Sequence, residues 1–102
     1  MVFDEIESYD TLTEAGRKMK HDICLMLQNY HLTDDDYVMS DMKVDATDDN
    51  ARLVLAIWTS KKHFPRHRAV KLLADLKIVA KRFDFTINSA FSIRQMFLHF
   101  SF

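Results

Sequence analysis

One stretch, from Arg52 to Arg68, constrains the fold of this 102-residue chain most strongly. Its first half carries apolar side chains on both faces of an extended chain. One face holds Leu53, Leu55 and Ile57, and the other holds Val54, Ala56 and Trp58. This pattern is typical of a strand in the middle of a sheet, where both faces are buried. We therefore expect a central strand here, covered on both sides.

The second half of the same stretch gathers basic and titratable side chains around Pro65. With one lysine from the following helix, they are Lys61, Lys62, His63, Arg66, His67, Arg68 and Lys71. Proline is favoured at the first helical position, so Pro65 predicts a helix start. A helix N-terminus offers free N–H groups and the positive end of the helix dipole, so the cluster predicts a phosphate site. The alternative is a solvated charge run that closes a loop and pairs with the acidic turn at residues 34–36.

Apolar periodicity predicts two helices. The first covers about residues 12–31, where Thr11 and Glu14 fit a capping box, and the second runs from Pro65 to Arg82. Gly16 falls on the apolar face of the first helix, which indicates that the helix backbone approaches the sheet closely there. Residues 1–9 are compatible with an edge strand or a flexible arm.

An alternating segment over residues 38–46 predicts a half-exposed strand. Its core face holds Val38, Met42, Val44 and Ala46. The turn at residues 47–50 then leads back into the central strand, with aspartate and asparagine supplying the positive φ that glycine usually supplies. These two segments are therefore predicted to form a hairpin.

The last twenty residues contain six phenylalanines. Their alternation with other apolar residues predicts strands with a break near Ser92–Gln95, as one long bent strand or as a second hairpin. The simpler interpretation is that the rings complete a small core. The alternative is that Phe97, Phe100 and Phe102 form a partner or self-association surface on an uncovered edge strand.

Together these elements predict a single α+β domain over residues 1–102. Its order is (β)αββαβ(β), with two helices packed on one face of a small antiparallel sheet. If residues 2–8 form a strand, the order becomes that of a ferredoxin-like plait. That fold hosts RNA-binding modules among many others, but the predicted central strand lacks the glycine and aromatic pattern of an RNA-recognition strand.

Composition and spacing argue against catalysis. Gly16 and Pro65 are the only residues of their types, so glycine-rich phosphate loops and the Gly-x-Ser-x-Gly nucleophile elbow cannot occur. The aspartates do not follow calcium-loop spacing, and His21 with Cys24 lacks a second pair of metal ligands. Nothing identifiable orients a base beside Cys24. We expect a protein that is not an enzyme and that holds no metal or cofactor.

The net charge of −1 hides a strongly bipolar chain. Residues 1–50 hold 13 acids and 4 Lys/Arg, a net of −9, whereas residues 51–102 hold 2 acids and 10 Lys/Arg, a net of +8. The halves can neutralise each other within one fold or between protomers, or a basic face is kept for an anionic partner, which is either nucleic acid or an acidic protein surface. The single cysteine and the acidic N-terminus predict a reducing, cytoplasmic location, and no apolar run reaches membrane-spanning length.

These observations lead to a small regulatory binding protein with two candidate classes of partner. In the first hypothesis it docks on nucleic acid, or on a machine that handles nucleic acid, and grips backbone phosphates without reading bases. In the second it is a protein–protein adaptor or inhibitor. That role would use the phenylalanine-rich C-terminal edge or the acidic N-terminal half, and a homo-oligomer is compatible with it.

Overall fold

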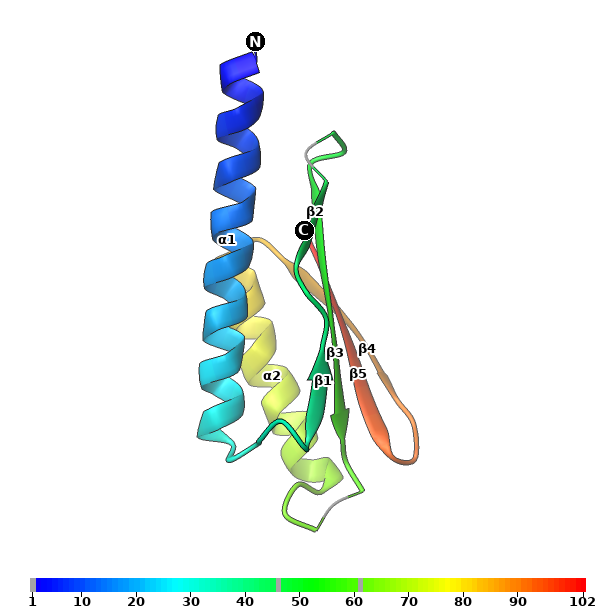
Figure 1. Ribbon diagram of the computed structural model, residues 1–102. Coiled ribbons are helices and arrows are strands. Elements are labelled where there is room, and N and C mark those ends of the chain that lie inside the picture. Colours follow the sequence, from blue (N-terminus) through cyan, green and yellow to red (C-terminus); the bar gives the residue numbers. More distant parts are fainter. Residues whose placement is uncertain (1, 46, 61) are drawn as a thin grey trace.

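In the computed structural model, which describes residues 2–45, 47–60 and 62–102, two helices and five strands form an α+β fold. In chain order they are α1 (Val2–Asn29), β1 (Tyr37–Met39), β2 (Lys43–Asp45), β3 (Asn50–Trp58), α2 (Arg66–Arg82), β4 (Thr86–Phe91) and β5 (Gln95–Ser101). Both helices lie on the same face of the sheet (Figure 1). The predicted fold class is confirmed.

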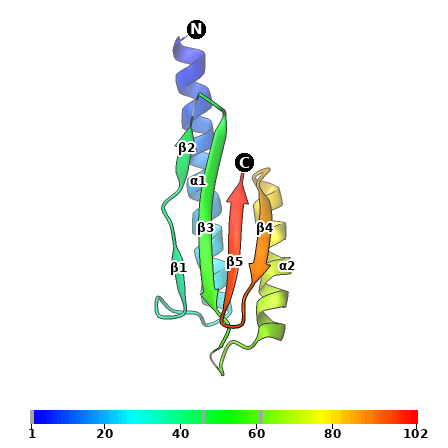
Figure 2. The same ribbon diagram turned by 90° about the vertical axis from the view of Figure 1, so that its right-hand side faces the viewer.

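The sheet is built around β3, as the sequence predicts. Its strand order is β1-β3-β5-β4, with β2 also paired to β3, and every pair is antiparallel. Because β3 and β4 both run antiparallel to β5, they are parallel to each other. With α2 between them in the chain and β5 between them in the sheet, they form a split βαβ unit. Figure 2 shows this order from the side opposite the helices.

The N-terminal segment is helical, so its prediction as an edge strand or a flexible arm was wrong over residues 2–9. α1 begins at Val2 and runs for 28 residues, which places Thr11 inside the helix instead of at its cap. Residues 2–11 contain neither proline nor glycine, and extending a helix that packing has already nucleated costs little. The first turns extend beyond the sheet (Figure 1). Because residues 2–9 form no strand, the described part of the chain contains one split βαβ unit and not the second one of a ferredoxin-like plait.

The core lies between the helices and one face of the sheet. Its largest contributions come from Met19, Ile23 and Leu27 of α1, from Leu72, Leu76 and Val79 of α2, and from Leu53, Leu55, Ile57, Met96, Leu98 and Phe100 of β3 and β5. The helical residues belong to the stripes that the periodicity predicts. Burial of about 25 cal/mol per Å² of apolar surface is the main force that holds these two layers together.

Within the described residues, no helix lies over the opposite face of the sheet, so the expectation that β3 is buried on both faces was wrong. Val54 of β3 is 45% exposed and Phe97 of β5 is 40% exposed on this side. Both helices lie on the other side of the sheet (Figure 1). The apolar side chains of β3 and β5 that point away from the helices therefore line a surface. We refer to this side as the open face.

A bulge separates β1 from β2. Because of it, the side chains of β1 point to the faces opposite to those predicted. Met39 pairs with Leu55 and Lys43 with Arg52, so four steps along one strand match three along the other. One extra residue is therefore inserted, as in a β-bulge. Ser40 fills the break, because its hydroxyl accepts the Val54 N–H at 2.9 Å and its own N–H donates to the Val54 carbonyl at 2.8 Å.

The parity change moves side chains that the alternation had assigned to the core. Val38 was predicted on the core face but is 64% exposed, whereas Tyr37 and Met39 pack against the core. After the bulge, Met42 and Val44 pack against the core as predicted. Ala46, the last residue predicted on this face, lies outside the described residues.

Gly16 does mark a close approach of the helix to the sheet, and its nearest neighbour there is the side chain of Met42. A Cβ atom at this position would lie 2.9 Å from Cγ of Met42, in the bulge between β1 and β2. The small residue on α1 therefore makes room for the methionine that the bulge turns inward.

Two further connections within the sheet are tight turns. Asp49 has a φ of 49° in the turn between β2 and β3, so an aspartate takes the left-handed conformation there, as predicted. The C-terminal residues form the second hairpin, β4–β5, closed where the Ser92 N–H donates to the Gln95 carbonyl at 2.8 Å. Because β5 lies between β3 and β4, it is not the uncovered edge that the sequence suggested.

The buried face of β3 gives a direct test of this arrangement. Leu55→Ala should lower the free energy of unfolding by about 2–5 kcal/mol, because a fully buried leucine is replaced by a cavity. Val54→Ala on the open face is the matched control and should cost less than about 1 kcal/mol. Urea denaturation followed by circular dichroism measures both. Equal losses at the two positions would contradict the one-sided packing of β3.

Candidate anion-binding site

The predicted basic cluster lies on the connection between β3 and α2 and on the first turns of α2. Phe64 anchors this connection, because its ring is fully buried and packs edge-on against Tyr30 at the end of α1, with the ring centroids 6.4 Å apart. Lys61 lies outside the described residues. Lys62, Arg66, His67 and Lys71 are all exposed. The apolar anchor thus holds the polar residues on either side of it at the surface.

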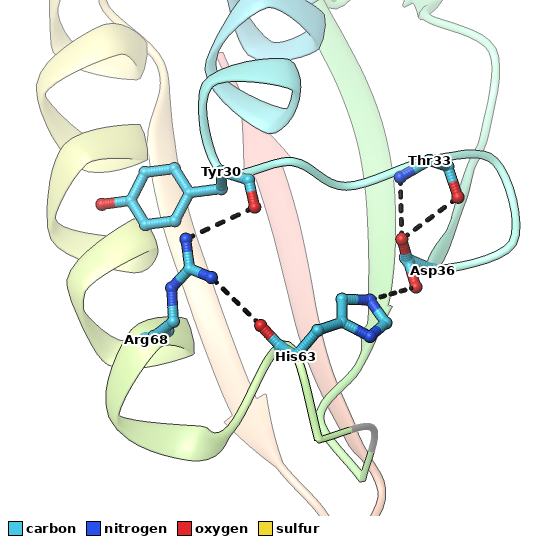
Figure 3. A network of polar contacts seen from close by, with 5 residues as sticks. All are labelled: Tyr30, Thr33, Asp36, His63 and Arg68. Carbon is cyan, nitrogen blue, oxygen red and sulfur yellow. Dashed lines mark hydrogen bonds and ion pairs between the residues drawn. The ribbon is translucent and has the colours of Figure 1, made fainter.

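A buried carboxylate ties this connection to the turn that follows α1 (Figure 3). Asp36 is 3% exposed, and its Oδ2 accepts hydrogen bonds from the Thr33 N–H at 2.8 Å and the Thr33 hydroxyl at 3.2 Å. Its Oδ1 lies 2.9 Å from Nε2 of His63. The alternative interpretation of the cluster, in which it pairs with the acidic turn, is therefore confirmed for His63.

Arg68 joins the start of α2 to the end of α1 (Figure 3). Its guanidinium donates to the backbone carbonyl of His63 at 3.0 Å and to that of Tyr30 at 3.4 Å. It also lies 5.6 Å from the centre of the Tyr30 ring and 5.8 Å from that of Phe64. These contacts give Arg68 a structural role, because a side chain that satisfies two carbonyls is held in place by the fold.

At the start of α2, fewer basic side chains remain available to an anion than the sequence suggested. Further basic side chains are exposed along the rest of the helix. Pro65 is the N-cap of α2 and no side chain caps the first turn. Arg66 there lies over the ring of Phe91, 4.7 Å from its centre. Towards the other end of α2, Lys77, Lys81 and Arg82 are also exposed. We call the exposed cations Arg66, Lys71, Lys77, Lys81 and Arg82 the basic face of α2.

The sequence contains the signal for this longer face. Val70 and Ile78 stand off the buried stripe of α2 and are 51% and 58% exposed. They lie in one row of four-residue spacing with Arg66, Ala74 and Arg82, and such rows form the ridges of a helix surface. The outer surface of α2 is therefore a small apolar ridge with an arginine at each end and lysines beside it.

The basic face has no acidic partner among the residues whose side chains are described. Among the described side chains, ion pairs join Arg17 to Glu14, Lys20 to Asp41 and His63 to Asp36. None of these pairs involves a lysine or arginine of α2. The one acidic residue of α2, Asp75, accepts the hydroxyl of Tyr30 instead. Within this part of the chain, the positive charge of α2 is left to solvent or to a partner.

The proposed phenylalanine interface does not form one surface. Phe100 is fully buried on the helix side of the sheet, whereas Phe97 lies on the open face of the same strand. Phe102 packs edge-on against Phe85, with their ring centroids 5.4 Å apart. Alternation along β5 sends Phe97 and Phe100 to opposite faces, which spacing alone could have indicated.

The other candidate residues, Cys24 and His21, do not belong to a metal site within the described residues. Cys24 is half-buried and His21 is exposed on α1. Across the described residues, no three side chains of histidine, cysteine, aspartate or glutamate lie together as a metal site. Neither helix is long and apolar enough over its described length to cross a membrane.

Two tyrosines near the site have raised pKa values. Burial, followed by the hydrogen bond to Asp75 and the charge of that carboxylate, raises the pKa of Tyr30 from 10.0 to about 12, although Arg68 acts in the opposite direction. Burial also raises the pKa of Tyr37, with smaller contributions from Cys24 and Asp34. Both shifts favour the neutral phenol in the folded chain.

Comparison of the chain with protein-family models, with curated proteins and with solved structures found no match. The basic face of α2 and the sheet are therefore the features from which a function can be inferred.

Removing the buried carboxylate tests the network in Figure 3. Asp36→Ala should lower the free energy of unfolding by about 1–3 kcal/mol, because it leaves the Thr33 N–H without its acceptor. Asp48→Ala, in an exposed turn, removes the same charge and should change stability by less than about 0.5 kcal/mol. Chemical denaturation of both variants measures the difference, and equal effects would show that Asp36 does not hold the connection.

Tyr30 makes a pH-dependent prediction. Its folded pKa of about 12 lies above the ordinary value of 10.0, so its contribution to stability is complete below pH 10 and is lost as pH rises through 12. The free energy of unfolding should therefore be higher for the natural chain than for Tyr30→Phe at neutral pH, and the gap should narrow above pH 10. A gap that does not change with pH would contradict the assignment.

Proposed function

We propose that this chain is a small, non-enzymatic binding protein that docks on the phosphate backbone of nucleic acid through the basic face of α2. One observation carries the proposal: five exposed lysine and arginine side chains share one helix, and none pairs with an acid among the described side chains. Lys62 and His67 at the start of the helix enlarge the same surface. The segment before the helix is fixed by Phe64 and Arg68, so this surface needs little ordering on binding.

The geometry suits backbone contact better than base readout. A helix of 17 residues is about 25 Å long, which spans several phosphates of one strand. Lysine and arginine contacts to phosphates set position and affinity but do not distinguish sequences. Since α2 exposes no asparagine or glutamine, it lacks the side chains that read adenine bidentately. We infer a role that depends on the presence of a polyanion more than on its sequence.

The same proposal places the protein in a reducing compartment such as the cytoplasm. Its only cysteine is unpaired, as is usual where thiols stay reduced. A regulatory protein that binds nucleic acid, or that binds a machine which handles nucleic acid, would function in that compartment.

The salt dependence of binding tests this proposal. If the five cations of the basic face each contact a phosphate of duplex DNA, log affinity should fall with log salt concentration at a slope of about −4.5. Lys71→Gln with Lys77→Gln should weaken binding to all sequences alike and reduce the magnitude of the slope by about 1.8. Fluorescence anisotropy with labelled DNA and RNA of several sequences measures both quantities.

A control of equal charge makes the result specific. Lys18→Gln with Lys43→Gln removes two exposed lysines from α1 and β2 and should leave the slope close to that of the natural chain. No binding of DNA or RNA at low salt would overturn the proposal. Equal effects of the two double variants would reduce it to non-specific charge attraction.

A further inference from the structure

The outer edge of β4 offers unpaired backbone groups in a known register. Ser92 donates its N–H towards Gln95 on β5, and hydrogen-bonding direction alternates along an antiparallel strand. Thr86, Asn88 and Ala90 therefore bond to β5, whereas Ile87, Ser89 and Phe91 point their N–H and C=O groups away from the sheet. No described residue pairs with this edge.

The two edges of the sheet differ in a way that favours β4 as a docking edge. The β1–β2 edge is broken by the bulge at Ser40 and carries Asp41, Lys43 and Asp45, which are devices that keep edges from pairing. β4 reads TINSAF over six continuous residues, without a charge, a proline or a bulge. An edge of this kind is a ready template for another strand.

The surroundings of the β4 edge select the chemistry of that strand. α2 runs behind β4 and past its outer edge (Figure 2). Arg66 lies over Phe91 at one end of β4, and Lys77 follows Arg66 by about three helical turns on the same side, a rise of about 16 Å that matches the length of β4. Two cations therefore stand near the two ends of the edge, on its helix side.

The open-face side of the same edge is apolar. A hollow of about 290 Å³ lies over β4 and β5, lined by Val54, Asn88, Ser89, Ala90, Phe97, Leu98 and His99. Phe97 is its largest exposed ring. A strand beside β4 would therefore meet cations with one set of alternate side chains and an apolar surface with the other.

We propose that β4 binds an extended segment of a partner protein, in which apolar residues alternate with acidic ones, as an added strand of the sheet. The apolar side chains lie on the open face beside the hollow, and the acidic ones turn towards Arg66 and Lys77. A second copy of this chain does not fit the same edge, because antiparallel pairing of two β4 strands brings both α2 helices, with their like charges, to one side of the joint. This interaction does not require nucleic-acid docking, although Arg66 and Lys77 also belong to the basic face of α2.

A synthetic strand tests the proposal directly. The probe is a fluorescein-labelled seven-residue peptide with blocked ends that alternates leucine and glutamate. It should bind the full chain in an anisotropy titration, and the amides of Ile87, Ser89 and Phe91 should gain protection from hydrogen exchange. The same peptide with lysine in place of glutamate should bind at least about tenfold more weakly.

Two changes separate strand addition from simple charge attraction. A peptide with alternate amides methylated keeps its side chains but loses backbone donors, and it should bind about tenfold more weakly. Ser89→Pro removes an outward N–H and is tolerated at an edge, so it should weaken the peptide while the unfolding midpoint stays close to that of the natural chain. Lys77→Glu should reduce the preference for glutamate over lysine, which supports the proposed side of contact even if Ser89→Pro does not fold.

Specific results would overturn the proposal. Failure of the leucine–glutamate peptide to bind at any soluble concentration would do so. So would equal binding of the methylated peptide, or an unchanged preference in Lys77→Glu.

Discussion

The one-sided burial of β3 is the constraint on which the other parts of this fold depend. β3 hydrogen bonds to β1 and β2 along one edge and to β5 along the other, while Leu53, Leu55 and Ile57 pack beneath the two helices. Two helices cover one face of a sheet this narrow, and the chain has no third helix among its described residues. The second face therefore stays open, with Phe97 and Val54 at its surface.

The same packing positions the candidate site. β3 ends at Trp58, whose N–H donates to the Asp36 carbonyl at 2.9 Å, so the strand end and the acidic turn are joined before the basic segment begins. Phe64 then enters the core, and Arg68 ties α2 to the end of α1. The basic face of α2 is the outer side of a helix whose inner side is fixed by six buried residues. Its cations are thus presented on a rigid support.

Features that depend on local periodicity could be predicted from the sequence. The buried stripes of α1 and α2 follow from helical spacing, the Asp49 turn follows from its residue types, and the length of β3 follows from its apolar run. The N-terminal turns of α1 could not be predicted in this way, because residues 2–9 carry no strong periodicity of either kind. Their helicity comes from continuity with a helix that packs elsewhere.

Features that depend on tertiary geometry were missed for identifiable reasons. Apolar residues on both faces of β3 were taken as evidence of double burial, but the number of covering helices decides that question. A single inserted residue near Ser40 moved the side chain of Val38 from the predicted core face to the exposed face. Nothing in the composition of this segment marks the insertion. In the basic cluster, charge alone could not show that His63 would bind Asp36. Nor could it show that Arg68 would donate to two backbone carbonyls.

Amide hydrogen exchange of the free protein tests the central claim most directly, because it reads each strand's place in the sheet. If β3 and β5 are interior, their amides should exchange slowest, near the rate set by global unfolding. Along β4, Asn88 and Ala90 should be protected, whereas Ile87, Ser89 and Phe91 should exchange quickly. Uniform protection along β4, or fast exchange throughout β5, would contradict the strand order on which this account depends.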